Sequence, residues 1–302
     1  MSERRAPFAM TGHDYLLYAG IIWAWSTSWY AIKLQLGAVA PEVSVFWRFL
    51  FTAPIMFALA RWRGEALVFP LRTQKWIVLT GLLMFSTNFI LFYYTGLYMP
   101  SGLMAVIFSL ASIINLTLGV LFAGEPFRWR LLLGSLLGVV GVAALFQPQL
   151  ASAASAPGAL TGLAIGVAGT LCFSTGNQIS ARLQRSGIGV LPATAWGMVY
   201  GTLWAGCIAL WRGESFAVPL TLPYLGSFVF LILSATVLAF YTYLTLVGRI
   251  GAARASYATV IFPVFALMIS TVLEGYQWTP LALAGLGLAL AGNILVLRRD
   301  RA

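Results

Sequence analysis

Charge is scarce in this chain of 302 residues. Only 9% of the residues are charged, whereas 60% are hydrophobic. Soluble domains carry about 25% charged residues, so this composition excludes an ordinary soluble globule. The formal net charge of +10 suggests nucleic-acid binding as an alternative. The basic residues, however, gather in the loops of one membrane side, and we therefore expect no nucleic-acid partner.

Metal-ligating side chains are also scarce. Cys172 and Cys207 both lie inside apolar stretches, and neither has a second thiol or a histidine at a metal-ligand spacing. We interpret both as small packing residues, and we predict no metal and no cofactor. The single histidine, His13, precedes the first apolar stretch, where a solvated side chain is expected and a proton relay is the alternative. Paired intramembrane acids are missing as well, so we do not expect an enzyme.

Acidic residues are absent from the middle of every apolar stretch. Besides those near the termini, they are Asp14, Glu42, Glu65, Glu125, Glu214 and Glu274, all at stretch ends or in loops. A proton-driven multidrug pump normally carries an embedded carboxylate, which both binds a cation and titrates. This absence disfavours cationic drugs as substrates and proton coupling through such a group.

Ten apolar stretches are long enough to be considered as membrane-spanning helices, which take about 20 residues each. They cover residues 14–37, 42–62, 75–98, 100–122, 128–146, 158–182, 191–211, 223–248, 252–273 and 278–297. None alternates polar and apolar residues as barrel strands do. The first stretch is too long for a signal peptide, so we expect it to be retained. The sequence predicts an all-α integral membrane protein with ten transmembrane helices.

The second half of the chain repeats the first at a constant offset of 149 residues. Trp47 pairs with Trp196, and the run Trp-Arg-Gly-Glu occurs at both 62–65 and 211–214. Each unit crosses the membrane five times, an odd number, so the second copy must lie upside down relative to the first. Inverted repeats of this kind are typical of transporters.

Loop charges predict the orientation of the two repeats. With the N-terminus in the cytoplasm, basic residues cluster inside, and Arg212 is the only basic residue of the outside loops. Arg63, its repeat mate, falls inside, as inversion requires. We therefore expect both termini to be cytoplasmic. The parts of the chain are a first five-helix repeat in residues 1–146, an external linker in 147–157 and a second, inverted repeat in 158–302.

Polar and aromatic residues inside the spans are candidates for a substrate site. Several recur three or four residues apart and therefore share a helix face. Hydrogen bonding between helices is the structural alternative for each one. A neutral, aromatic-lined cavity would suit a zwitterionic or uncharged solute with an apolar body. The candidate substrate-binding residues are Trp23, Ser26, Tyr30, Arg48, Phe85, Asn88, Phe92, Ser109, Ser112, Asn177, Gln178, Tyr241 and Tyr257.

Once the basic residues of the loops and inner span ends are assigned, Lys33 and Arg48 remain within spans. Arg48 is about two helical turns below Glu42, where it either reaches outward or binds a buried partner or a substrate carboxylate. Lys33 and its repeat mate Arg182 lie near the outer and inner mouths. They either reach the headgroups or form cationic lips that attract a carboxylate. Arg48 pairs with Gly197, so the halves differ there, as an asymmetric substrate would require.

Short motifs in the fourth and ninth spans carry a family resemblance. They are Pro-Ser-Gly-Leu-Met-Ala at 100–105, Gly-Glu-Pro at 124–126, Gly-Ala-Ala-Arg-Ala at 251–255 and Pro-Val-Phe-Ala at 263–266. With ten spans in two halves, the chain resembles EamA-type members of the drug/metabolite transporter superfamily, and among them the exporters of aromatic amino acids. The resemblance implies a central cavity lined by spans one, three, four, six, eight and nine, with spans five and ten as scaffold.

The functional prediction is an alternating-access exporter in a bacterial inner membrane, which carries small metabolites, chiefly aromatic and other neutral amino acids. A transporter of drug-like amines or phosphorylated sugars is the alternative on the same fold, but amines need an embedded acid and phosphates need clustered cations. Glycines four residues apart, such as Gly134 and Gly138, favour helix packing within a monomer over a dimer seam. We expect substrate and membrane lipid as the partners. A structural or signalling membrane protein is a further alternative.

Overall fold

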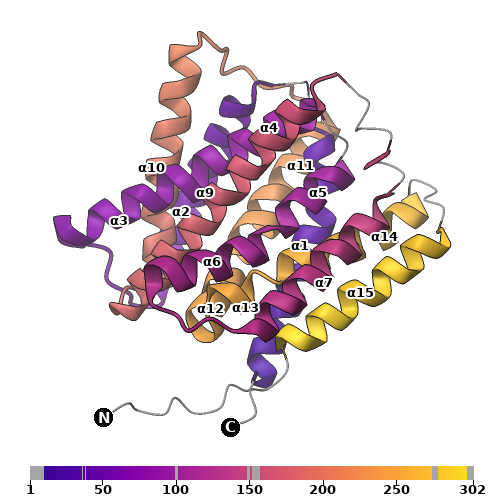
Figure 1. Cartoon of the computed structure of the whole chain (residues 1–302). Helices are drawn as coiled ribbons and strands as arrows, with labels where there is room; N and C mark the ends of the chain where they lie inside the picture. The colour runs from indigo at the N-terminus through magenta and orange to yellow at the C-terminus, as the bar shows by residue number, and fades with distance from the viewer. Residues whose placement is uncertain are drawn as a thin grey trace, which may run out of the picture.

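A computed structural model shows a bundle of long helices (Figure 1). The structure describes residues 10–35, 37, 39–98, 101–147, 150–151, 157–273 and 278–297. Helix α1 begins, and helix α15 ends, on the same side of the bundle, where Asn293 Nδ2 donates a hydrogen bond to Tyr18 Oη at 2.9 Å. We name this side the terminal side, and the other the opposite side.

Each of the ten predicted stretches is helical in its described part. The elements are α1 (Gly12–Lys33), α2 (Pro41–Trp62), α3 (Leu71–Leu82), η1 (Leu83–Thr87), α4 (Asn88–Tyr98), α5 (Ser101–Ser109), α6 (Ala111–Ala123), α7 (Trp129–Leu145), α9 (Ala159–Arg185), α10 (Val190–Trp211), α11 (Leu222–Ile232), η2 (Leu233–Leu238), α12 (Ala239–Ile250), α13 (Ala252–Ala255), α14 (Ala258–Leu273) and α15 (Pro280–Leu297). The described residues contain no strand. The all-α prediction is therefore confirmed.

Seven helical segments among the described residues are long and apolar enough to cross a membrane. They are Pro41–Trp62, Leu71–Tyr98, Met104–Ala123, Ala159–Arg185, Val190–Trp211, Leu222–Ile250 and Pro280–Leu297. Two shorter apolar helices, Trp129–Leu145 and Ala252–Phe265, correspond to the predicted fifth and ninth spans. Helix α1 has 22 residues, enough to cross the hydrocarbon core at 1.5 Å per residue.

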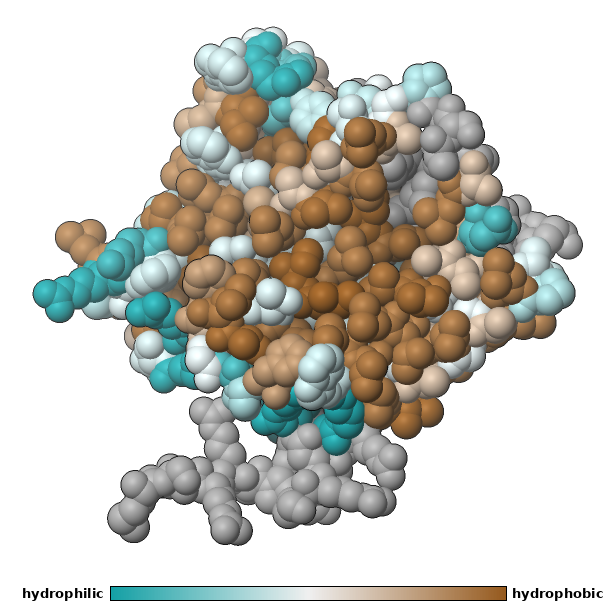
Figure 2. Space-filling model, viewed as in Figure 1, coloured by the Kyte–Doolittle hydropathy of each residue, from teal (hydrophilic) through white to brown (hydrophobic). Residues whose placement is uncertain are grey.

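The outer surface of the bundle is apolar. Figure 2 shows a broad hydrophobic area across the middle of one face, with hydrophilic residues gathered at its edges. Large apolar side chains point outward, among them Val140 (55% exposed) and Ile294 (67% exposed). Such an area on a soluble monomer would be unusually large, whereas lipid is its natural surrounding. The chain is a multi-pass membrane protein.

Helices α2 and α10 join the two halves through a reciprocal pair of hydrogen bonds. Trp47 Nε1 on α2 donates to the Phe216 carbonyl at 3.0 Å, and Trp196 Nε1 on α10 donates to the Leu67 carbonyl at 2.7 Å. Both the two donors and the two acceptors are 149 residues apart. Each half therefore closes on the other by the same contact.

Helices α7 and α15 pack against each other through glycines (Figure 1). A Cβ atom on Gly141 would lie 2.6 Å from the Gly285 carbonyl oxygen, and one on Gly285 would lie 2.6 Å from that of Gly141. Real Cβ atoms do not approach so closely, so glycine is required at both positions. These helices form one flank of the bundle, as the family resemblance implies for spans five and ten.

Two spans contain a π-helical turn at corresponding places. Element η1 interrupts the third predicted span, and η2 interrupts the eighth; they begin at Leu83 and Leu233, 150 residues apart. A π turn breaks the regular hydrogen-bond ladder and is frequent at functional sites. Asn88 directly follows η1 and Ala235 lies within η2, so both turns border the cavity described next.

Candidate substrate cavity

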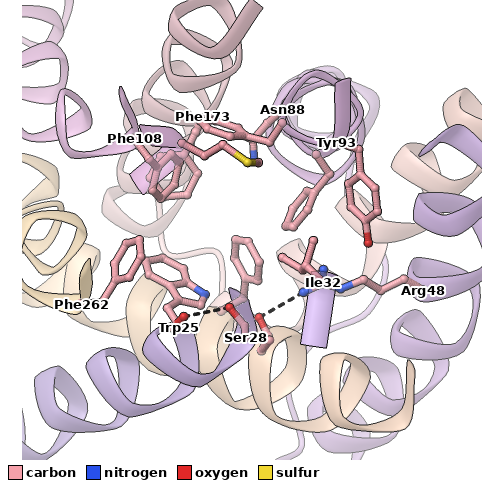
Figure 3. Close-up of a pocket in the computed structure, with 14 residues that line it drawn as sticks. Trp25, Ser28, Ile32, Arg48, Asn88, Tyr93, Phe108, Phe173 and Phe262 are labelled. Atoms are coloured by element: carbon pink, nitrogen blue, oxygen red, sulfur yellow. Dashed lines mark hydrogen bonds between the residues drawn. The ribbon is translucent and has the colours of Figure 1, made fainter. Parts of the chain in front are cut away.

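A cavity of about 630 Å³, including the space at its mouth, lies between helices of both halves (Figure 3). It is lined by Trp25, Ser28, Ile32, Arg48, Asn88, Phe89, Phe92, Tyr93, Met104, Phe108, Phe173, Ala235, Phe240 and Phe262. These residues come from the first, second, third, fourth, sixth, eighth and ninth predicted spans. The first half supplies most of the wall, and the second half supplies four residues.

The cavity occupies the half of the bundle nearer the opposite side. Trp25 and Ile32 lie in the second half of α1, and Arg48 lies in the first half of α2, where these helices approach that side. Phe173 and Phe262 lie near the middle of their spans and form the deeper wall. A solute in the cavity would therefore sit between the midplane and the opposite side.

An aromatic cluster forms the deep end of the cavity. The Trp25 ring meets Phe173, Phe240 and Phe262 edge to face, each with ring centroids 6.0 Å apart. Phe108 lies 6.3 Å from Trp25 in the same arrangement. Edge-to-face pairs are a favourable geometry for aromatic rings and hold one another in place. The cluster offers a rigid, apolar slot that an aromatic or aliphatic solute could enter.

Arg48 is the one cation among the described lining residues, and it is only 3% exposed. Its Nε donates to Thr236 Oγ1 at 2.7 Å, and its Nη2 lies 3.4 Å from the Ala235 carbonyl oxygen. Its Nη1 has no hydrogen-bond partner. The Phe89 ring lies 4.9 Å from the guanidinium carbon, a cation–π distance. Figure 3 shows this side chain reaching across from α2 toward the cavity.

Asn88 supplies the second polar group with unused hydrogen-bonding capacity. It is 4% exposed; its Nδ2 donates weakly to the Met84 carbonyl at 3.4 Å, and its Oδ1 has no partner. Ser28, by contrast, already donates to the Trp25 carbonyl at 2.9 Å. Tyr93 donates to Gln35 Oε1 at 3.1 Å. Arg48 Nη1 and Asn88 Oδ1 are candidate contacts for a ligand, because both are without a partner and belong to residues that line the cavity.

Polar and aromatic contacts close the cavity toward the terminal side. The Tyr243 ring stacks on Phe173 at 5.5 Å, and Asn177 Nδ2 donates to Tyr243 Oη at 2.8 Å. About two turns further along α9, Gln184 Nε2 donates to the Leu244 carbonyl at 2.8 Å. These bonds join α9 to α12 on the terminal side of the aromatic cluster. Helices of the second half therefore close the cavity toward the terminal side.

An ion pair at the helix ends adds to this closure. Arg249 at the end of α12 donates to the carboxylate of Asp14 at the start of α1, and Thr11 also donates to that carboxylate at 2.8 Å. Asp14 is buried, while the Arg249 side chain is 41% exposed. The contact ties the first half to the second at the edge of the bundle.

Helix packing differs between the two sides. On the terminal side, a Cβ on Gly81 would lie 2.5 Å from the Gly197 carbonyl oxygen, so α3 and α10 touch through their backbones. In the first half, the position that corresponds to Gly197 holds Arg48, which reaches from α2 to η2. The bulky side chain of Arg48 thus occupies the position that is a glycine in the other half, and the cavity lies beside Arg48.

Three of the predicted substrate-binding residues line the cavity: Arg48, Asn88 and Phe92. Phe85 is fully buried one turn before Asn88 and packs on Phe49 and Phe240, behind the wall. Of the three predicted residues in the third span, Asn88 and Phe92 therefore line the cavity and Phe85 does not.

The residues predicted on α1 lie outside the cavity lining where the structure describes them. Trp23 is 55% exposed on the outside of the bundle, and Ser26 donates to the Phe262 carbonyl at 3.0 Å, outside the lining. The cavity is instead lined by Trp25, Ser28 and Ile32, which also recur at helical spacing. Polarity favoured the first set in the sequence, but packing against α14 decides which face turns inward. The side chain of Tyr30 is outside the described part of the structure.

Four more predicted residues bind neighbouring helices or their own helix instead of lining the cavity. Ser109 donates to the Val106 carbonyl at 2.6 Å, and Ser112 to the Ser109 carbonyl at 3.0 Å. Gln178 donates to the Asn115 carbonyl at 2.9 Å, and Asn177 binds Tyr243 as described above. Helix-to-backbone bonding of this kind is the ordinary role of small polar residues inside membranes.

Tyr257 and Tyr241 also lie outside the cavity lining. Tyr257 is fully buried and donates to the Gly134 carbonyl at 2.8 Å, so it belongs to the junction of α14 with α7. The Tyr241 ring lies 5.2 Å from the guanidinium of Arg63 in a cation–π contact.

Of the two predicted mouth cations, only Arg182 has a side chain in the described part of the structure. The Arg182 guanidinium lies 4.5 Å from the Trp76 ring centre, on the surface of the bundle. The Lys33 side chain is outside the described part of the structure.

Most of the lining residues that were not predicted from the sequence are aromatic or apolar. They include Trp25, Ile32, Phe89, Met104, Phe108, Phe173, Phe240 and Phe262. In a chain with 20 phenylalanines, no sequence signal separates a lining ring from a core or lipid-facing ring. One weak signal existed for Trp25, Ser28 and Ile32, because a serine between two large apolar residues at helical spacing is an alternative stripe on α1.

Comparison with known proteins places this geometry in a family. Residues 10–147 and 160–298 each match the model of the EamA-like transporter family. Protein PagO of Salmonella typhimurium is 24% identical over 273 residues, which cover 86% of this chain and 85% of that protein. A probable terminal-alkyne amino-acid exporter of Streptantibioticus cattleyicolor is 25% identical over 239 residues, covering 76% of this chain and 74% of the exporter.

A third relative is a probable amino-acid metabolite efflux pump of Salmonella typhimurium, 24% identical over 291 residues, which cover 94% of each chain. A solved crystal structure superimposes with a TM-score of 0.76 at 18% identity, over 94% of this chain and 96% of the other. At that identity the likeness concerns the fold alone. The two family matches together cover most of the sequence, and the chain therefore belongs to the EamA-like transporter family.

Proposed function

We propose that this protein exports amino-acid-class metabolites across the bacterial inner membrane by alternating access. The observation that carries the proposal is the aromatic cavity with one buried cation, Arg48, walled by helices of both halves and closed toward the terminal side. Family membership supports transport, and two relatives have names that specify amino-acid or amino-acid-metabolite export. An apolar slot with a few polar anchors suits a small amphipathic solute.

The proposed mechanism uses the two halves as inverted repeats that rock around the cavity. The reciprocal indole bonds of Trp47 and Trp196 and the matching π turns support such a relation. In transporters of this type the substrate lies near the midplane between the repeats, and closure passes from one side to the other. The units would be residues 1–146 and 158–302, joined by a linker at 147–157.

The proposed orientation has both termini in the cytoplasm. The terminal side carries the basic loops, including Arg63 and Arg128, whereas Arg212 is the only basic residue in the loops of the opposite side. In that orientation the structure is closed to the cytoplasm, and its cavity lies toward the outside. An exporter would release its substrate from this conformation.

The proposed substrates are aromatic and other apolar amino-acid-class solutes. The resemblance to the inner-membrane aromatic amino-acid exporter YddG favours this class, and the ring cluster around Trp25 offers a matching slot. Phosphorylated sugars fit poorly, because Arg48 is the single cation in the described lining. Cationic drugs fit poorly as well, since the described lining holds no acid.

Counterflow in proteoliposomes tests the proposal. Vesicles are loaded with unlabelled phenylalanine or N-acetylphenylalanine, and accumulation of the labelled solute is measured. We expect accumulation of at least one of them, and no accumulation of ethidium. Phe173→Ala should reduce it about tenfold by opening the ring cluster, because aromatic contacts of this kind contribute on the order of 1 kcal/mol each.

Phe127→Ala is the matched control, because Phe127 is 49% exposed in a terminal-side loop far from the lining. It should transport like the unaltered protein. Accumulation of ethidium with neither amino-acid-class solute would contradict the proposed function. So would equal loss of activity in both variants.

A further inference from the structure

The charge of Arg48 is uncompensated within the described structure. Glu42, the acid nearest to it on α2, accepts a hydrogen bond from Tyr94 at 2.6 Å and pairs with Arg212 at 3.3 Å. No carboxylate among the described residues lies within ion-pair distance of Arg48. Its partners are the hydroxyls of Thr236 and Tyr93, a carbonyl and an aromatic face, all neutral. The cavity therefore carries a net positive charge in a low-dielectric setting, which is unfavourable until an anion enters.

A free amino acid would relieve this charge poorly. Its carboxylate could bind Arg48 Nη1, but its ammonium group would then lie about 5 Å from the guanidinium, a distance at which like charges repel strongly away from bulk water. The zwitterion also has no net charge, so the cavity would stay positive. A carboxylate without an ammonium group neutralises Arg48 and brings no second cation.

The acceptors of the lining favour the same class. An ammonium group has three donors and a positive charge, and it needs acceptors and a counter-charge when buried. The described lining offers Asn88 Oδ1 and the hydroxyl oxygens of Ser28 and Tyr93, which are all neutral, and it holds no carboxylate to balance an ammonium charge. An amide N–H has one donor, which Asn88 Oδ1 alone can satisfy. The remaining lining is aromatic or aliphatic and accepts the rest of the molecule.

We infer that the preferred substrate is an aromatic amino acid whose amine is acylated, a monocarboxylate with one amide N–H, with its carboxylate on Arg48, its N–H on Asn88 and its ring in the cluster around Trp25. This inference rests on the proposed function and specifies the substrate class of that same site. The unmodified amino acid is a weaker ligand, and the amino-acid amide, which is a cation, is excluded.

Equilibrium binding to the purified full-length protein tests the inference without any variant. Labelled N-acetylphenylalanine is the probe, and the competitors are phenylalanine, phenylalaninamide and N-acetylphenylalaninamide. We expect N-acetylphenylalanine to bind at least tenfold more tightly than phenylalanine. Phenylalaninamide should not compete. Binding of phenylalanine as tight as that of N-acetylphenylalanine would overturn the inference.

Two variants assign the contacts. Arg48→Gln should lower the ratio of affinities for N-acetylphenylalanine over uncharged N-acetylphenylalaninamide at least tenfold, and Arg48→Lys should retain more of the ratio. Asn88→Leu should weaken N-acetylphenylalanine more than 3-phenylpropionate, which has no N–H. An unchanged ratio in Arg48→Gln would remove Arg48 as the carboxylate contact. Because each measure is a ratio within one variant, partial loss of folded protein does not imitate it.

The outcomes also separate this inference from the proposed function. Counterflow of phenylalanine without N-acetylphenylalanine would overturn the inference and leave export of amino acids standing. Failure of both solutes in counterflow would overturn both proposals.

Discussion

Gly138 and Gly287 occupy matching positions in the two halves, yet their surroundings differ. A Cβ atom on Gly138 would lie 2.1 Å from Tyr257 Oη and 2.5 Å from Val260 Cγ1. At Gly287 nothing lies within 4 Å of the corresponding position. The difference arises because Tyr257 fills the space beside α7 to reach the Gly134 carbonyl. Two glycines at matching positions of the repeat thus differ in role. Gly138 is needed for close packing, and Gly287 is not.

Gly138→Ala should therefore destabilise the protein, while Gly287→Ala should not. Overpacking of a well-filled interior costs about 1–3 kcal/mol, whereas alanine in place of an unhindered helical glycine stabilises by up to about 1 kcal/mol. Thermal unfolding in detergent should show a lower Tm for Gly138→Ala and an equal or higher Tm for Gly287→Ala. Equal shifts in the two variants would contradict the packing described for Tyr257.

At the scale of elements, helices were the most predictable feature. The ten predicted stretches match helices in the structure. A long apolar segment in lipid must satisfy its backbone hydrogen bonds internally, and an α-helix does so within the single segment. The π turns at η1 and η2 were not predicted. They depend on how each span packs on its neighbours, and neither segment contains proline or glycine to mark it.

Helices α2 and α10 offer a test of the reciprocal contact between the halves. Trp47→Phe and Trp196→Phe each remove one indole N–H and leave a carbonyl without its partner, and each should cost about 1 kcal/mol. We expect similar decreases in Tm for the two variants, and an approximately additive decrease in the double variant.

Trp211→Phe is the control for these variants, because Trp211 is 87% exposed at the end of α10. Its Tm should stay unchanged. A decrease as large as that of Trp47→Phe would mean that loss of the indole itself, and not of the inter-half bond, lowers stability.

At the scale of the whole molecule, closure of the terminal side depends on few contacts. The ion pair of Asp14 with Arg249 joins the start of the first helix to the second half at the edge of the bundle, and the hydrogen bond of Asn293 with Tyr18 joins them one turn further along α1. Partly exposed ion pairs are weak, about 0.3–1 kcal/mol, so this contact can open in the proposed rocking mechanism. The ion pair is therefore suited to favouring the conformation that is closed on the terminal side without preventing its opening.

Arg249→Gln should shift the protein toward opening on the terminal side. A reporter is Ser180→Cys, a buried position on the terminal half of α9, in a Cys172→Ala, Cys207→Ala background. Labelling of this cysteine by a polar thiol reagent in nanodiscs should be about two- to fivefold faster in Arg249→Gln, since the pair is worth about 0.5–1 kcal/mol. Arg249→Lys should label at an intermediate rate.

Arg185→Gln serves as the control, because Arg185 is an exposed arginine on the same side. It should label like the reporter alone. Acceleration by Arg185→Gln equal to that by Arg249→Gln would indicate a general effect of charge on the reagent, and would remove the ion pair as a determinant of closure.

The sequence by itself determined that this is a helical membrane protein, where its helices run and which family it resembles. Composition, span length and motifs are local properties, and a chain in lipid has few ways to satisfy them. Only the tertiary structure decided which face of each helix turns inward. It placed Trp25 at the cavity and Trp23 outside, and it left Arg48 and Asn88 with unpaired atoms where Ser109 and Ser112 were satisfied by their own helix. In a span that is apolar all round, rotation about the helix axis depends on the fit between neighbouring helices, and no single segment contains that information.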